Sequence, residues 1–281
     1  MRSDSYTIGF AAVITIVCSL LLSIAYTALK PIQDVNVDNY VKSNILAVAK
    51  VEVKQGADIG KLFSENLKLQ FVTTQGDFVK LNDVDSKKYK NFVKEFKNAG
   101  LDKNEVNLPL PESAKDLKLP LYTKLNSKGD VELYILPVHG MGLWSLLEGY
   151  IALEADLNTV SGITFYQQTE TAGLGAEIQA AWFPANFPGK KIYNADGKLV
   201  SIKVKKGKVD SSKPNEVTHM VDGISGATIT GDGVTTFLLK DLTLYEPAFK
   251  KIIEAQRLKS IVSDTLKTAQ INSAEAVKNV N

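Results

Sequence analysis

The sequence predicts an α+β fold in which one amino-terminal transmembrane helix is followed by a mixed, largely antiparallel β-sheet domain with flanking helices. Residues 7–29 carry no charged side chain over a length that spans a bilayer. From about residue 116 short β-branched or aromatic segments alternate with turn residues, and apolar residues at helical spacing precede and follow this part. We therefore divide the chain into an anchor, a helical and linker region, the sheet domain, and a carboxyl-terminal helix with its tail, over residues 1–30, 31–115, 116–250 and 251–281.

The charge balance and the few metal-binding side chains exclude several classes of protein. The 281 residues include 33 basic and 31 acidic side chains, whereas a nucleic-acid-binding surface would require a clustered basic excess. One cysteine and two histidines, without a CxxC or HExxH motif, argue against a metal site built by this chain alone. A lone cysteine in an apolar helix is usually a small hydrophobe, so Cys18 could contribute only to a metal site shared with other subunits.

The uncharged segment at residues 7–29 predicts a retained membrane anchor. It is longer than the roughly 7–15 apolar residues of a signal peptide. Arg2 precedes it and Lys30 follows it, and acidic residues contribute little to orientation. These charges give a slight bias toward a cytoplasmic amino terminus, which places the residues after Lys30 outside the cytoplasm.

Three helices and a linker are expected between the anchor and the sheet domain. Within residues 38–51, Val41, Ile45 and Val48 fall on one helical face, and a short helix follows at residues 56–67. A third helix over residues 83–100 should end at Gly100 and present one apolar face, formed by Tyr89, Phe92, Val93 and Phe96. The proline-rich residues 107–120 predict a linker.

The later part of the chain predicts strands followed by two helices. The strands are expected at residues 119–125, 131–138, 149–156, 162–168 and 199–209. NSKGD and NADGK predict hairpin turns, and the near-alternating lysines of SIKVKKGK are typical of the exposed face of a strand. Helices should cover residues 233–242 and 246–266, with Pro247 near the first turn of the second, and the tail beyond Gln270 should be loose.

Two glycine-containing segments could form either plain turns or contacts with a flat ligand. In HGMGLWSLLEGY, at residues 139–150, glycines allow close backbone approach and the Trp144 indole could cover a ring; the alternative is a tight turn with a core tryptophan. In TETAGLGAEI, at residues 169–178, Gly173 to Gly175 could expose backbone amides, but so short a GxG is also typical of a loop. No third glycine completes a dinucleotide-binding fingerprint there.

The segment DGISGATIT, at residues 222–230, predicts either an anion site at a helix start or an N-capping turn. Its small residues leave room above the backbone, while Ser225, Thr228 and Thr230 offer hydroxyls beside free helix-start amides. In the alternative, Thr230 or Asp232 caps the following helix. Composition and spacing leave both interpretations open.

DGISGATIT resembles the flavinylation motif of FMN-binding domains, in which a flavin transferase joins the phosphate of FMN to the last threonine of Ser-Gly-Ala-Thr. GMGLWS, GYIALEAD, TETAGLG and PGKK are similar, in this order, to blocks of the NqrC family, the C subunits of the sodium-translocating NADH:quinone oxidoreductases. This resemblance implies covalent FMN at Thr228. It further implies cofactor contacts from Ser225, Gly226, Ala227, Thr230, Thr171, Leu174, Gly175 and Trp144. Ala172 stands where the family usually has proline, so that loop should be less rigid.

The same resemblance implies a protein that carries electrons on FMN within a larger complex and is not catalytic alone. Its partners would be the other membrane subunits of a hetero-oligomer of about six different subunits, and a flavin transferase for maturation. The complex would oxidise NADH, reduce quinone and pump sodium in a bacterial inner membrane, with the FMN domain on the periplasmic side.

Two alternatives stay open at this stage. The G subunit of the Rnf electron-transport complex, a ferredoxin:NAD oxidoreductase, has a similar anchor and motif, although the GLWS and LEAD blocks favour the quinone-reductase family. The other alternative is an anchored extracytoplasmic binding module without flavin, in which DGISGATIT is only a capping turn.

Overall fold

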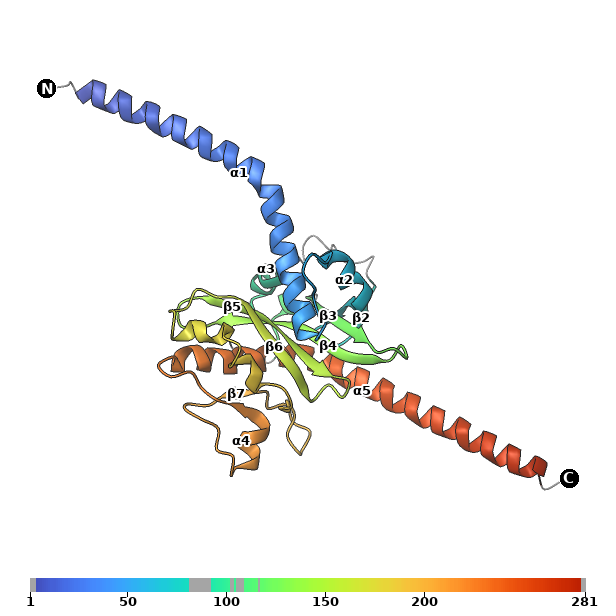
Figure 1. The fold of residues 1–281 in the computed structure, drawn as a ribbon. Helices are drawn as coiled ribbons and strands as arrows, with labels where there is room; N and C mark the ends of the chain where they lie inside the picture. Colours follow the sequence, from blue (N-terminus) through green and yellow to red (C-terminus); the bar gives the residue numbers. More distant parts are fainter. Residues whose placement is uncertain (1–3, 81–91, 102–103, 105–108, 116, 279–281) are drawn as a thin grey trace.

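The computed structural model describes residues 4–80, 92–101, 104, 109–115 and 117–278. Its centre is a six-stranded antiparallel sheet, from which two long helices project in different directions (Figure 1). Helix α1 (Asp4–Val48) carries the amino terminus away from the sheet, and α5 (Thr228–Lys278) carries the carboxyl terminus away. The predicted α+β class with a largely antiparallel sheet is confirmed.

The anchor is the first part of α1, which continues well beyond the boundary expected at residue 30. Among the residues that the structure describes, α1 is the one helix long and apolar enough to cross a membrane. Pro31 lies inside it and removes one intrahelical hydrogen bond without ending the helix. The helix expected at residues 38–51 is the end of α1, where Ile45, Leu46 and Val48 are buried. Cys18 lies exposed in the anchor part.

The strands lie in the order β2-β1-β3-β4-β5-β6, and every neighbouring pair is antiparallel. The expected turn NSKGD closes the β3–β4 hairpin, with the Asn126 N–H donating to the Asp130 carbonyl oxygen (2.8 Å). The strands are β1 (Leu67–Thr73), β2 (Phe78–Val79), β3 (Lys118–Leu125), β4 (Val131–Met141), β5 (Leu146–Glu154) and β6 (Val160–Gln167).

The structure corrects the domain boundary expected near residue 115. Strand β1 pairs with β3 along its whole length, from Leu67 opposite Lys124 to Thr73 opposite Lys118. The sheet therefore begins inside the region expected to hold only helices and a linker. The expected short helix is present as α2 (Ile59–Asn66), capped by the Asp58 side chain.

Part of the region before β3 lies outside the described residues, including Tyr89 and the expected helix start. Its described end is α3 (Phe92–Asn98), which buries Phe92 and Phe96. Gly100 follows with a positive φ of 75°, as expected for a residue that ends a helix. The expected linker contains the short 3₁₀ helix η3 (Glu112–Ala114) and the first residues of β3.

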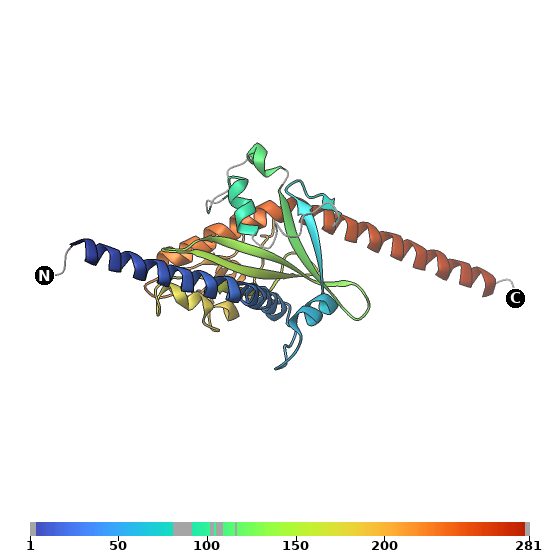
Figure 2. The ribbon, with the colours of Figure 1, turned by 90° about the horizontal axis from the view of Figure 1, so that it is seen from above.

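The two faces of the sheet are covered by opposite ends of the chain, as the view from above shows (Figure 2). The first half of α5 packs on one face and encloses the main core, which includes Phe237, Tyr245 and Phe249. The end of α1 and α2 cover the other face, where Tyr150 and Ala152 of β5 are buried. Alternating residues of β5 thus contribute to two cores.

Helix α5 replaces the two helices and the loose tail that the sequence predicted. Pro247 lies inside this helix rather than near a first turn, and the helix continues to Lys278. It begins at Thr228, so the prediction that Thr230 or Asp232 caps it is wrong.

Two glycines, Gly231 and Gly233, therefore lie inside the first turns of α5. A Cβ on Gly233 would lie 2.3 Å from the Met141 carbonyl oxygen, and one on Gly231 would lie 3.0 Å from Val204 Cγ1. Close packing of the helix against the end of β4 outweighs the low helix propensity of glycine.

The strand expected at residues 199–209 is reduced to β7 (Lys203–Val204), which pairs in parallel with β8 (Met220–Val221). Helix α4 (Pro214–His219) precedes β8, and its Glu216 forms an ion pair with Lys205. The lysines of this segment therefore do not form one strand face. The NADGK turn is confirmed by the Asn194 N–H to Lys198 carbonyl bond (3.0 Å).

Candidate functional site

The first turn of α5 borders a pocket of about 360 Å³. The chain turns at Gly226, whose φ of 73° suits glycine, and the helix begins at Thr228. The first intrahelical bond runs from the Gly231 N–H to the Ala227 carbonyl oxygen (3.0 Å). The N–H groups of Thr228, Ile229 and Thr230, which precede this first bond, are therefore left for a ligand or solvent, as at any helix start.

The pocket brings the SGAT motif together with a lysine-rich segment. Ser225, Gly226, Ala227 and Thr228 line one side, and Lys205, Lys206 and Lys208 line another. Lys205 is paired with Glu216, whereas Lys206 and Lys208 are exposed and form no ion pair within the described part of the chain. The pocket thus combines helix-start amides with positive charge, which is a suitable setting for an anion.

Thr228 and Thr230 face different environments. An α-helix turns by about 100° per residue, so residues two apart point to nearly opposite sides. Thr228 is exposed at the pocket, whereas Thr230 is buried and donates a hydrogen bond from its Oγ1 to Glu170 Oε2 (2.8 Å). The Thr230 side chain therefore links the helix start to Glu170. Thr230 is not among the residues that line the pocket.

Glu170 joins the three segments that the sequence singled out. Its carboxylate accepts hydrogen bonds from the N–H groups of Leu143 (3.2 Å), Trp144 (2.9 Å) and Ser145 (2.9 Å), and from the hydroxyls of Ser145 (3.0 Å) and Thr230 (2.8 Å). Burial raises the pKa of this carboxyl, but the donors from Trp144, Thr230 and Ser145 outweigh burial and hold the pKa below its usual value. The group is therefore ionised at neutral pH.

Two glycines leave room for this carboxylate. A Cβ on Gly142 would lie 2.8 Å from Glu170 Oε1, and a Cβ on Gly175 would lie 2.7 Å from both Glu170 Oε2 and Thr230 Oγ1. Gly175 is buried under the loop rather than exposed toward the pocket. Gly175 is thus packed against Glu170 and Thr230. The exposed part of the loop is Thr171 to Leu174.

Large apolar side chains are exposed in the segments that meet at Glu170. Trp144 is 70 % exposed, Leu174 is 40 % exposed, and Ile229, beside Thr228, is 58 % exposed. Leu174 reaches the SGAT turn, because a Cβ on Gly226 would lie 2.8 Å from Leu174 Cδ2. An aliphatic side chain, Leu174, therefore lies beside the SGAT turn, and an aromatic one, Trp144, is exposed on the loop that Glu170 binds; both are of a kind that packs on a flat, apolar ring.

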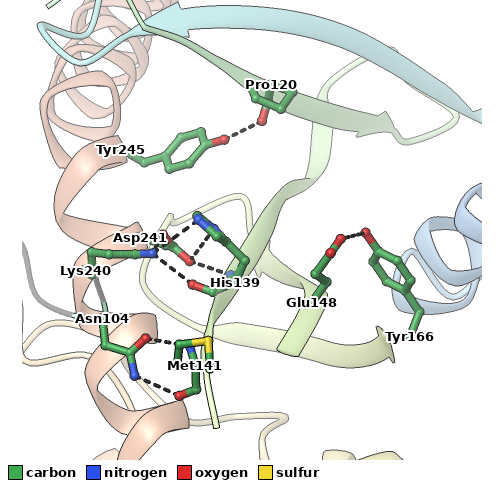
Figure 3. Close-up of polar contacts among 9 residues, drawn as sticks. All are labelled: Asn104, Pro120, His139, Met141, Glu148, Tyr166, Lys240, Asp241 and Tyr245. Carbon is green, nitrogen blue, oxygen red and sulfur yellow. Dashed lines mark hydrogen bonds and ion pairs between the residues drawn. The ribbon is translucent and has the colours of Figure 1, made fainter. Parts of the chain in front are cut away.

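Polar contacts, among them the buried His139, Lys240 and Asp241, connect β4 to α5 (Figure 3). The His139 N–H donates to Asp241 Oδ2 (2.7 Å), and Lys240 Nζ donates to the His139 carbonyl oxygen (2.9 Å). Burial raises the pKa of the Asp241 carboxyl, but Lys240 and His139 together outweigh burial and hold this pKa below its usual value. The Asn104 side chain pairs with both the N–H and the carbonyl oxygen of Met141 (2.6 and 2.8 Å). These contacts hold the residue that leads into the Gly142–Ser145 loop.

The glycine-rich segments that the sequence singled out meet at Glu170, but the sequence did not indicate the residues that connect them. Lys206 and Lys208 were interpreted as a strand face, and Glu170 was treated only as part of a loop motif. A possible signal for Glu170 was an acidic residue directly before a turn-forming TAGLG segment. Its partners, however, lie 25 to 60 residues away in sequence, so local spacing does not reveal them.

The part of the chain that contains these contacts is similar to known proteins. The FMN-binding domain family matches residues 142–242. A protein from Vibrio campbellii (strain ATCC BAA-1116), named as the C subunit of a Na(+)-translocating NADH-quinone reductase, is 36 % identical over 234 residues, covering 81 % of this chain and 86 % of that protein. The protein of the same name from Pseudomonas aeruginosa is 35 % identical over 244 residues, covering 84 % and 90 %.

Solved structures of similar proteins share the fold. The crystal structure of the C subunit of the Na(+)-translocating NADH-quinone reductase from Parabacteroides distasonis has a TM-score of 0.59 and 31 % identity, and the match covers 79 % of this chain and 96 % of that one. The crystal structure of NqrC from Shewanella oneidensis has a TM-score of 0.59 and 25 % identity, with 75 % and 95 % covered. The sheet and its covering helices are therefore a fold that these proteins have in common.

Proposed function

The chain belongs to the NqrC family of Na(+)-translocating NADH-quinone reductase subunits, and we propose that it carries electrons within its complex on an FMN esterified to Thr228. The complex is an oxidoreductase that transfers electrons from NADH to quinone and translocates sodium. This chain contributes an FMN-binding domain and an amino-terminal apolar helix that anchors it in the membrane. The other subunits of the complex are its partners.

One observation carries the proposal for Thr228: this residue is exposed and lines a lysine-lined pocket at a helix start, while the neighbouring Thr230 is buried and its hydroxyl is bonded to Glu170. A phosphodiester keeps about one negative charge, and a helix start stabilises an anion by about 0.3–1 kcal/mol. Ser225 to Thr228 would surround the phosphate, and Lys206 and Lys208 would add positive charge. Attachment by a flavin transferase belongs to the same proposal.

When bound, FMN supplies the one- and two-electron redox chemistry, and the protein supplies binding, orientation and electrostatics. Thr171, Leu174 and Trp144 are exposed in the two loops that meet at Glu170, and these residues would contact the ring or its tail. A covalent bond removes the need for a deep pocket. One face of the flavin ring would then stay exposed, so that the ring could exchange electrons with neighbouring subunits.

The orientation in the membrane is also part of the proposal. With the amino terminus in the cytoplasm of a bacterial cell, α1 would cross the inner membrane and place the flavin domain on the periplasmic side. The slight positive-charge bias around α1 supports this orientation. A cysteine at Ser127, in the exposed β3–β4 turn, should react with an impermeant thiol reagent in right-side-out membranes. If this cysteine does not react, the orientation is the opposite of the one proposed.

Of the alternative functions, the interpretation as the Rnf G subunit is less well supported, because relatives at 33–36 % identity over most of the chain are quinone-reductase subunits. The binding module without flavin is disfavoured by the match to the FMN-binding domain family.

The attachment site is tested by expressing the full chain with a flavin transferase and viewing a denaturing gel under ultraviolet light. Wild type should give a fluorescent band and Thr228→Ala should give none. Thr230→Ser, which keeps the hydroxyl bonded to Glu170, should retain the fluorescence. A fluorescent Thr228→Ala band would place the attachment elsewhere.

A further inference from the structure

The Glu170 carboxylate lies where the Trp144 loop, the Leu174 loop and the first turn of α5 meet. It accepts hydrogen bonds from the loop that carries Trp144, precedes the loop that carries Leu174, and accepts another from Thr230 in the first turn of α5. Thr230 is only two residues, or about 3 Å of helix axis, beyond Thr228. A displacement of this carboxylate would therefore change the position of Thr228 relative to both apolar side chains.

Dipoles, rather than a cation, stabilise the charged carboxylate of Glu170. Within the described residues no lysine or arginine forms an ion pair with it, and its hydrogen-bond donors are three backbone N–H groups and two hydroxyls. The buried group therefore keeps a net negative charge close to Thr228. A fixed negative charge opposes the addition of an electron to a nearby group, and this effect is stronger where water is excluded.

We propose that Glu170 is a positioning residue for the flavin. Its carboxylate fixes the Trp144 loop, the Leu174 loop and the start of α5 relative to one another, and its charge lowers the reduction potential of the bound flavin. This inference rests on the proposed attachment of FMN to Thr228. Glu170 would not itself react, but it would influence the reduction potential of the flavin and the mobility of the flavin ring.

The charge and the geometry can be separated by two near-isosteric substitutions. Glu170→Gln removes the charge but keeps the size, and Thr230→Val removes one donor but keeps the charge. The full chain, flavinylated during expression, is compared by redox titration of the flavin absorbance and by flavin fluorescence anisotropy. Thermal unfolding of each variant serves as a control for folding.

Glu170→Gln should raise the midpoint potential of the flavin and lower its anisotropy. Thr230→Val should lower the anisotropy, with a smaller change in potential than Glu170→Gln. A folded, flavinylated Glu170→Gln variant with the potential and anisotropy of wild type would overturn the proposal. If Glu170→Gln does not fold, Thr230→Val decides, because unchanged anisotropy in that variant would refute the positioning role.

The outcomes also separate this inference from the proposed function. Absence of covalent flavin in wild type, or its persistence in Thr228→Ala, would refute the attachment at Thr228. If wild type is flavinylated and both Glu170→Gln and Thr230→Val keep the wild-type potential and anisotropy, only the role of Glu170 is refuted.

Discussion

Replacement of Gly233 by alanine tests whether close packing between α5 and the end of β4 explains the glycines in the first turns of α5. The added Cβ would lie 2.3 Å from the Met141 carbonyl oxygen and 3.3 Å from Gly142 Cα. Both are backbone atoms, so the helix or the strand end would have to move. Overpacking of this kind costs about 1–3 kcal/mol.

The helix propensity of alanine acts in the opposite direction. Alanine is better than glycine inside a helix by about 1 kcal/mol. We therefore expect Gly233→Ala to lose up to about 2 kcal/mol of unfolding free energy, because the clash is with backbone atoms and outweighs the gain in propensity. For a domain of this size, each kcal/mol corresponds to a decrease of about 2–4 °C in Tm.

Gly231 offers a matched control in the same turn of α5. Its Cβ would meet only the Val204 side chain, at 3.0 Å from Cγ1, and a side chain can adjust by a few tenths of an ångström. Gly231→Ala should therefore be neutral or slightly stabilising. Both variants are compared in the detergent-solubilised full chain by denaturant and thermal unfolding without flavin. Equal stability of the two variants would refute the argument from packing.

Two further predictions concern charge. Reversal of Lys206 and Lys208 to glutamate should decrease covalent flavin incorporation and lower the flavin midpoint potential, because both lysines line the pocket; Lys128→Glu, in the exposed β3–β4 turn, should change neither on the same gel and titration. The second concerns pH: the folded-state pKa of Glu170 lies below its ordinary value of 4.5, so its stabilising contribution is present above the unfolded pKa and is lost as pH falls through the folded pKa. The stability difference between wild type and Glu170→Gln, measured by denaturant unfolding from pH 7 to pH 3, should accordingly shrink below about pH 4.5; a constant difference would show that the charge does not contribute.

Several elements of the fold followed from local patterns in the sequence. The uncharged residues 7–29, the NSKGD hairpin and the strands on either side of it have a length, a turn composition or a periodicity that acts within a few residues. Strand β1 was missed although Leu67, Leu69 and Phe71 alternate with polar residues, which is a local strand pattern. What the local pattern does not give is its place in the sheet, because its partner, β3, lies on the far side of a segment that contains α3.

For the candidate site, the sequence by itself singled out the glycine-rich segments and, through resemblance, predicted FMN at Thr228. Only the tertiary structure decided which threonine lines the pocket, because two threonines so close in sequence differ only in the side of the helix on which they lie. Only the tertiary structure placed Lys206 and Lys208 beside the motif and Glu170 beneath it. Motif chemistry depends on neighbouring residues, whereas the charge around a cofactor depends on groups that folding brings together from distant parts of the chain.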